Sequence, residues 1–310
     1  MKKFEWPDEL KFIENRMARQ HQCDESMAGK TCVITGATSG VGLEAARTLA
    51  SRGARLVLVC RNPEKGERVS QEIKSRWPVE VQLVVADFSD LDQVRQAAAI
   101  VLDSVPHLDV LINCAGLHST RYTETAAGIE TVFCVNHLAS FLFTQLLLDR
   151  LKASSPARII QINSEGHRFS TVHLDDLNWK GHHYTGLKGY GASKTAQLLT
   201  VWHFAVLLQG TQVTINAMHP GDVRTNIGQN NGWLYRAFSR YFIRWFLKDP
   251  VISGEAICYL ASAPELGEVS GRFFNLTLEE KPAAHALDRD LGKRVWAVSM
   301  KMTGLVPSQP

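Results

Sequence analysis

Short apolar runs alternate with longer amphipathic segments along most of this chain. The apolar runs are continuous rather than alternating, as expected of strands that are covered on both faces. Strict alternation of strand and helix predicts a parallel, doubly wound sheet with right-handed crossovers. Strands are expected at Thr31–Thr35, Arg55–Cys60, Glu80–Ala86, Val110–Asn113, Arg158–Asn163, Gln212–Ala217 and Arg272–Asn275, and helices near residues 41–52, 64–76, 90–104, 125–151, 190–209 and 251–262.

The pattern predicts one α/β domain with an extension at each end. Residues 1–29 are polar and mixed in charge, with one helix expected from Pro7 to Arg19. Residues 30–280 carry the alternation of strands and helices and contain neither an internal repeat nor a second core. Residues 281–310 are expected to form a docked C-terminal helix and a frayed tail. The apolar face of that helix would carry Leu287, Leu291, Val295, Val298 and Met302.

Bulk composition narrows the class of protein. The 310 residues are 45% hydrophobic and 21% charged with a net charge of +3, which favours a soluble globular protein and gives no reason to propose a nucleic-acid partner. The six cysteines are scattered, as expected of buried thiols in a reducing compartment. The N-terminus lacks the apolar segment of a secretory signal, and no apolar run approaches the roughly 18 residues of a membrane span. We expect a cytoplasmic protein, with peripheral membrane contact left open.

A glycine-rich turn, Thr35–Gly42, follows the first expected strand and opens the first expected helix. Glycine is needed where a side chain would block close approach of the backbone to a pyrophosphate, and a helix N-terminus supplies N–H groups there. An ordinary tight turn is the alternative interpretation. The candidate cofactor contacts in the turn are Gly36, Thr38, Ser39, Gly40, Val41 and Gly42.

Residues that follow the next strands extend this candidate cofactor site. Arg61 stands where an acidic residue would bind a ribose 2′-hydroxyl, and a cation there accommodates a 2′-phosphate, which favours NADP over NAD. A solvated loop arginine is the alternative. Asp87 could accept from an adenine amino group, although helix capping through Ser89 or Asp90 explains the nearby polar residues equally well. Phe88, Asn113, Ala115 and Gly116 complete these candidate contacts.

Tyr190 and Lys194 stand four residues apart at the head of a helical stretch, so their side chains share one helix face. A nearby positive charge favours the phenolate, and lowering a phenol pKa from about 10 to about 7 corresponds to ~4 kcal/mol. Tyr190 would then exchange protons near neutral pH. A glycine turn that can hold a dinucleotide, followed by such a tyrosine, indicates hydride chemistry.

Two further polar residues are candidates for the same site. Ser164 follows the fifth expected strand, at the edge where doubly wound sheets bind ligands, and could hold a substrate carbonyl oxygen; alone, it would be interpreted as a turn residue. Asn136 lies within a helical run where a buried amide needs partners. It is either structural or part of a kinked helix whose amide and carbonyl anchor a water chain to Lys194.

These motifs, in this order, resemble the short-chain dehydrogenase/reductase family, with His219–Thr225 as a fifth signal. The resemblance covers about residues 30–276 and implies a single-domain Rossmann fold with a seven-stranded sheet of order 3-2-1-4-5-6-7 flanked by helices. It implies that Pro220, Gly221, Val223 and Thr225 hold the nicotinamide carboxamide and the diphosphate.

The resemblance also implies roles for four catalytic residues. Tyr190 would be the general acid/base, Ser164 would orient the carbonyl, and Asn136 would support a proton relay. Lys194 would hold the nicotinamide ribose and lower the tyrosine pKa.

Within this family the chain is similar to the retinol dehydrogenase branch, through Val59–Asn62, Val135–Leu138 and a C-terminal tail with Trp296. There are departures. Asn163 precedes Ser164 where that branch often has a second serine, Cys114 replaces the commoner asparagine, and the N-terminal membrane anchor usual in that branch is not expected here. These departures leave the expected fold unchanged but weaken a transfer of retinoid specificity.

A segment between the sixth strand and the last core helix, residues 228–249, is expected to cover the substrate as a lid. Within it, residues 233–248 place aromatic side chains on one helical arc and basic side chains on another. An interfacial membrane helix and plain core packing are the alternatives. No metal site is expected, because the spacing of His167, His173, His182 and His183 fits no established ligand pattern.

The sequence therefore predicts an NADP(H)-dependent oxidoreductase that interconverts an alcohol with a ketone or aldehyde on a bulky apolar substrate, such as a retinoid or a steroid. The alternatives are an NAD(P)-binding regulator or scaffold without turnover, a steroid or quinone reductase, and a tailoring ketoreductase of secondary metabolism. A monomer and a homodimer are both compatible with the sequence.

Overall fold

An eight-stranded sheet forms the centre of the protein, as seen in a computed structural model that describes residues 18–221 and 250–305. The strand order is β3-β2-β1-β4-β5-β6-β7-β8, in which only β8 runs antiparallel to its neighbour. The strands are β1 (Thr31–Thr35), β2 (Arg55–Cys60), β3 (Val81–Val85), β4 (Val110–Asn113), β5 (Ala157–Ile162), β6 (Val213–His219), β7 (Phe273–Asn275) and β8 (Leu278–Glu279).

The predicted fold class and strand order are confirmed, and the predicted strand number is one too low. The additional strand β8 pairs with β7 through a hairpin in which Asn275 lies opposite Leu278. Leu276, in the hairpin turn, has a φ of 56°. Hairpins of this kind are normally recognised by Gly, Asn or Asp at the turn. A leucine in the left-handed region and a two-residue strand leave no such signal.

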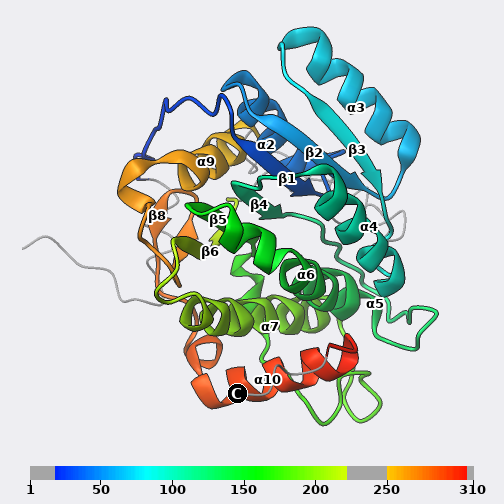
Figure 1. Ribbon diagram of the computed structural model, residues 1–310. Helices are drawn as coiled ribbons and strands as arrows, with labels where there is room; N and C mark the ends of the chain where they lie inside the picture. Colours follow the sequence, from blue (N-terminus) through cyan, green and yellow to red (C-terminus); the bar gives the residue numbers. More distant parts are fainter. Residues whose placement is uncertain (1–17, 222–249, 306–310) are drawn as a thin grey trace, which may run out of the picture.

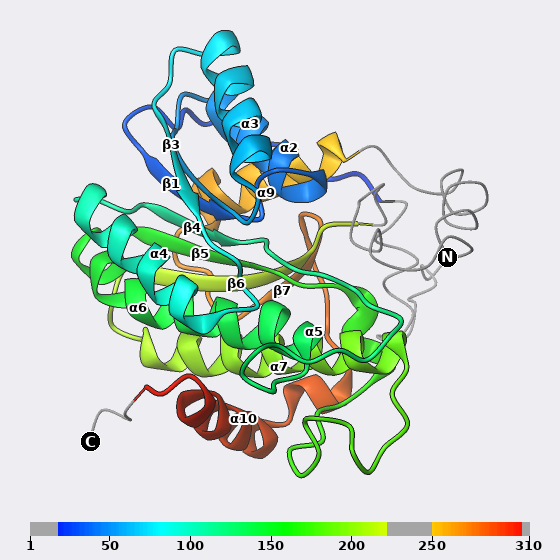
Figure 2. The same ribbon diagram turned by 90° about the vertical axis from the view of Figure 1, so that its right-hand side faces the viewer.

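Helices cover both faces of the sheet (Figures 1 and 2). One face is covered by α2 (Gly40–Ser51), α3 (Pro63–Arg76) and α9 (Val251–Ser262), and the other by α4 (Leu91–Ser104), α6 (Ala139–Ala153) and α7 (Gly186–Leu207). The short α5 (Thr131–Phe133) and a π-helical turn η2 (Cys134–Leu138) lead into α6. The remaining elements within the described residues are three 3₁₀ turns, η3 (Glu165–Phe169), η5 (Pro264–Leu266) and η6 (Ala284–Leu287), and the helix α10 (Arg289–Met302).

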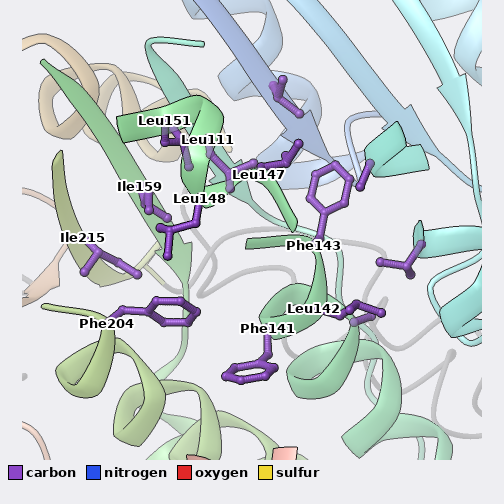
Figure 3. Packing of buried hydrophobic residues seen from close by; sticks show 14 of the residues in the cluster. Leu111, Phe141, Leu142, Phe143, Leu147, Leu148, Leu151, Ile159, Phe204 and Ile215 are labelled. Atoms are coloured by element: carbon purple, nitrogen blue, oxygen red, sulfur yellow. The ribbon is translucent and has the colours of Figure 1, made fainter. Parts of the chain in front are cut away.

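Large apolar side chains fill the space between the sheet and α6 (Figure 3). Leu147 and Phe143 of α6 are fully buried, and Leu111, Ile159 and Ile215 of the sheet belong to the same cluster. Burying a side chain of this size stabilises the fold by roughly 1.5–3 kcal/mol. This layer fixes the relative positions of the strand ends from which the functional side chains project.

One helical stretch among the described residues, Thr131–Ala153, is long and apolar enough to cross a membrane by length and composition. However, 83% of its most apolar window is buried inside the fold. Packing against the sheet and α7 therefore accounts for its apolar surface.

The C-terminal helix α10 packs against α7, on the side of α7 that faces away from the sheet (Figure 2). Leu291 and Val295 are buried in this contact, as predicted. Leu287 lies before the helix in η6 and is 39% exposed, so its predicted place on the docked face is wrong. The reason is that Asp288 caps the helix, which therefore begins at Arg289, after Leu287. The predicted Pro7–Arg19 helix falls almost wholly outside the described residues, and so does the tail after Leu305.

Candidate active site

A cleft of about 510 Å³ lies where β1, β2, β4 and β5 end. Its lining includes Gly36 and residues 38–42 of the glycine turn, together with Arg61, Asp87, Ser164 and Tyr190. Asn113 and Asn136 lie behind the lining, whereas Val223 and Thr225 lie outside the described residues. The remaining candidate residues all line this one cleft: Gly36, Thr38, Ser39, Gly40, Val41, Gly42, Arg61, Asp87, Phe88, Ala115, Gly116, Ser164, Tyr190, Lys194, Pro220 and Gly221.

The glycine turn is constrained by its own backbone. Gly36 has a φ of 70°, and a Cβ added there would lie 2.8 Å from the Cα of Ala115. A Cβ on Gly42 would lie 2.6 Å from the carbonyl oxygen of Gly36. Ser39 precedes α2 but makes no side-chain capping bond, so first-turn N–H groups remain for an anionic ligand. The turn therefore suits a dinucleotide diphosphate.

Thr35 links this turn to the end of β4 through hydrogen bonds. Its Oγ1 accepts hydrogen bonds from the backbone N–H of Cys114 at 3.0 Å and of Ala115 at 2.9 Å. Because Thr35 is fully buried, this contact holds two walls of the cleft at a fixed separation. This role of Thr35 has no signal in the sequence, because a buried threonine at a strand end is an ordinary core residue.

The end of the cleft that follows β2 and β3 is open and charged; we call Arg61, Lys65 and Asp87 the cofactor rim. The Arg61 side chain is 65% exposed, and its Nη1 lies 3.9 Å from Asp87 Oδ2. The other oxygen of Asp87 accepts from the N–H and hydroxyl of Ser89 at 2.9 and 2.8 Å. Asp87 therefore orders its own turn and faces Arg61 at the same time. Lys65 was missed because the sequence places it among ordinary surface charges of a helix.

Tyr190 lies one helical turn inside α7 with its ring held between two neighbours. A Cβ on Gly166 would lie only 2.6 Å from Tyr190 Cε1, so the backbone of Gly166 packs directly on the ring. The ring of His118 makes an edge contact with the Tyr190 ring, and the two ring centroids lie 5.4 Å apart. Ser164 hydrogen-bonds to Tyr190, which brings both hydroxyls together. Gly166 therefore leaves room for the Tyr190 ring, a role for which the sequence carries no signal.

The pKa values of the pair differ from the sequence-based expectation. Burial raises the pKa of Tyr190 to about 12, and the hydrogen bond with Ser164 opposes this rise only in part. Burial also lowers the pKa of Lys194 to about 8. The expected lowering of the tyrosine pKa by Lys194 is therefore wrong for this arrangement. The Nζ atom of Lys194 lies 5.7 Å from the centre of the Tyr190 ring, and loss of hydration outweighs its attraction.

The ammonium of Lys194 is directed at acceptors below the cleft. Its Nζ donates to the carbonyl oxygen of Ile162 and to Oε1 of Gln197, both at 2.9 Å. Its backbone carbonyl accepts from Asn163 Nδ2 at 2.9 Å. A cation that is 3% exposed is held here by two neutral oxygens, which leaves its pKa sensitive to either one.

Asn136 lies in the π-helical turn η2, which agrees with the predicted kink. Its Oδ1 accepts from the N–H of Leu117 at 2.8 Å, and its Nδ2 donates to the Leu117 carbonyl and to Ser193 Oγ, both at 3.0 Å. Its own carbonyl accepts from Ser140 Oγ at 2.9 Å and from Gln197 Nε2. Asn136 thus fixes the wall of the cleft, and the Gln197 side chain connects it to Lys194.

Other predicted features lie apart from the cleft or outside the described residues. Of the insert histidines, His167 is buried and accepts from the N–H of Ala283. His182 is bound to Asp176 at 2.8 Å. Within residues 18–221 and 250–305, no group of three or more His, Cys, Asp and Glu side chains could hold a metal ion. The predicted lid, residues 228–249, lies outside the described residues.

Comparison with known proteins gives consistent results. The model of the short chain dehydrogenase family matches residues 30–233. The chain is 38% identical to human retinol dehydrogenase 13 over 90% of this chain and 86% of that protein. It is 35% identical to human retinol dehydrogenase 14 over 97% and 95%, respectively. Among solved structures, an uncharacterized protein from Mycobacterium paratuberculosis matches with a TM-score of 0.73 and 30% identity, over 90% of this chain and 95% of that one.

Proposed function

Since this chain belongs to the short-chain dehydrogenase family, we propose that it is an NADP(H)-dependent oxidoreductase that interconverts an alcohol with a ketone or aldehyde on a bulky apolar substrate. The observation that carries the proposal is the convergence of Ser164, Tyr190 and Lys194 on the cleft that the glycine turn also lines. A dinucleotide turn and a proton donor are the two parts that carbonyl reduction requires.

The hydroxyls of Ser164 and Tyr190 would both contact the substrate oxygen. Ser164 and Tyr190 are already hydrogen-bonded to one another, so a carbonyl oxygen between them would receive two donors. With its pKa raised, Tyr190 is protonated near neutral pH and is suited to give its proton to the oxygen. The ammonium of Lys194 would stabilise the negative charge that the phenol gains in this step. The nicotinamide, when bound, supplies or accepts the hydride.

The preference for NADP over NAD is proposed from the cofactor rim. Arg61 offers an exposed guanidinium at the place where a 2′-phosphate would lie, and Lys65 adds a second cation to the same lining. A guanidinium binds phosphate through charge-assisted, often bidentate hydrogen bonds. Its existing contact with Asp87, at 3.9 Å, is loose enough to be exchanged for a phosphate.

A retinoid-like substrate is proposed from the relatives, which include retinol dehydrogenases of human and mouse. The identity of 35–38% with the human enzymes supports the same chemical class. Steroid ketones and quinones share the bulky apolar character and belong in the same test. A cytoplasmic location, with membrane contact through residues 233–248, is proposed from the sequence alone.

The test is consumption of NADPH or NADH by the full chain with retinal, a steroid ketone, a quinone and an aliphatic aldehyde. We expect faster turnover with NADPH than with NADH, and with bulky apolar carbonyls than with short aldehydes. Binding of NADPH without turnover of any of these compounds would contradict the proposal and favour a regulator on the same fold.

A further inference from the structure

A buried amide joins two polar residues beneath the cleft. Gln197 lies on α7 one turn after Lys194 and is 1% exposed. Its Oε1 accepts from Lys194 Nζ at 2.9 Å and from Asn163 Nδ2 at 3.1 Å. Its Nε2 donates to the carbonyl oxygen of Asn136. One side chain therefore contacts the ammonium, the kinked helix and the end of β5.

The orientation of this amide is determined by its partners. An ammonium only donates and a carbonyl oxygen only accepts, so the oxygen of Gln197 must face Lys194 and its nitrogen must face Asn136. The reversed orientation would set donors against donors and acceptors against acceptors in a buried site, at the cost of several unmade hydrogen bonds. Gln197 is thus fixed in one state.

The Gln197 amide connects Asn136 to Lys194 directly. Its Nε2 donates to the carbonyl oxygen of Asn136, which also lies 2.9 Å from Ser140 Oγ. The Ser140 hydroxyl has a second acceptor in the carbonyl oxygen of His137 at 3.0 Å. An amide neither gains nor loses a proton near neutral pH, so it holds the ammonium in place without passing protons to it.

We propose that Gln197 is a positioning residue of this dehydrogenase, whose amide holds the Lys194 ammonium below Tyr190 and links it to the backbone of Asn136. The inference rests on the proposed function, because it gives Lys194 a part in catalysis. Its physical content is separate: the oxygen of Gln197 stabilises the charged form of Lys194, and it is one of the two acceptors given above for that ammonium.

The test compares Gln197→Met with Gln197→Glu. Methionine keeps the length of the side chain and removes the acceptor, so the pKa of Lys194 should fall by about one pH unit or more. Glutamate places a carboxylate beside the ammonium, so the pKa should rise. Damage to packing would not move the two variants in opposite directions. Thr200→Val is the matched control, because Thr200 is buried on the same helix and bonds only to backbone carbonyls of α7.

The first readout is NMR titration of the full chain labelled with ¹³Cε-lysine, in which the Lys194 signal is identified by its loss in Lys194→Met. The second is the pH profile of carbonyl reduction, whose upper limb should move with the NMR value in each variant. Equal Lys194 titration in wild type, Gln197→Met and Gln197→Glu would overturn the inference.

The two proposals fail in different ways. A wild-type protein that turns over no carbonyl compound refutes the proposed function, and then the NMR titration still decides whether Gln197 holds the ammonium. An active enzyme with an unmoved titration refutes the positioning role alone.

Discussion

The two ends of the cleft are built in opposite ways. The catalytic cluster, which we define as Asn136, Ser164, Tyr190, Lys194 and Gln197, is largely buried and bound by hydrogen bonds to neighbouring backbone. The cofactor rim has an arginine that is 65% exposed and one ion pair at 3.9 Å. Buried polar networks tolerate little change, because each unsatisfied group costs free energy, whereas exposed ion pairs contribute little to stability. The fold therefore holds the catalytic cluster in place, whereas the cofactor rim can change with little effect on stability.

The largest effect is expected from Tyr190→Phe. The substitution removes the proton donor and keeps the ring that packs between Gly166 and His118. Turnover should fall by about 10²–10⁴-fold, the usual contribution of a general acid, while the Kd for NADPH stays within about twofold. Steady-state kinetics and fluorescence titration with NADPH measure the two quantities. Turnover like that of wild type would remove Tyr190 from the mechanism.

A second variant, Gly166→Ala, tests whether the ring must be fixed as well as present. The new methyl group would lie 2.6 Å from Tyr190 Cε1 and push the phenol away from Ser164. Because a misplacement of about 1 Å can cost about 10²-fold in rate, we expect a loss of this order in kcat. Gly292→Ala, on α10, is the matched control, since its methyl group would meet Leu199 of α7 at an ordinary contact distance of 3.5 Å. Equal kcat in both variants would show that the phenol position is not constrained.

A smaller and different effect is expected at the cofactor rim. Arg61→Asp should lower the ratio of kcat/KM for NADPH to that for NADH by about 10–100-fold. This is the change expected from the loss of a hydrogen bond to a charged group, which contributes about 1.5–3 kcal/mol. The Tm should hardly change, because Arg61 is exposed. Arg76→Asp, on the outer surface of α3, provides the control. An unchanged ratio in Arg61→Asp would refute the preference for NADP.

The smallest effect is expected from a change of pH, which alters the charge of Lys194 in the catalytic cluster. Lys194, with a pKa of about 8, is cationic below that pH and loses its charge above it. The rate of carbonyl reduction should therefore fall by up to about tenfold as the pH rises from about 7 to about 9. Circular dichroism over the same range controls for unfolding. A rate that stays constant through this range would mean that the charge of Lys194 does not assist the phenol.

The parallel strands were predictable because each is a continuous apolar run flanked by a helical pattern. For three strands, β1, β2 and β4, the first and last residues agree with the prediction. The antiparallel β8 was not predictable, since Leu276 gives no turn signal and two residues carry no periodicity. Hydrophobic periodicity indicates which side chains are buried, and it gives no information on a very short strand that pairs at the edge of a sheet.

The candidate site was predictable where residue type implies chemistry, as for Tyr190 and Lys194. It was not predictable where a residue acts through distance alone. Gly166 matters because its missing side chain leaves room for a ring, and Gln197 matters because three polar groups converge on it. The pKa of Tyr190 was also misjudged, since helix spacing shows the proximity of a cation but not the burial that opposes it.

The most direct test of the central claim is to follow the hydride itself. The full chain would be incubated with NADPH that carries deuterium at both C4 positions of the nicotinamide and with retinal or a steroid ketone, and the alcohol product would be analysed by mass spectrometry. The account predicts an alcohol with one deuterium at the carbinol carbon for the wild type and none above background for Tyr190→Phe. Bound NADPH with no deuterated alcohol, or equal deuterium transfer by both proteins, would contradict it.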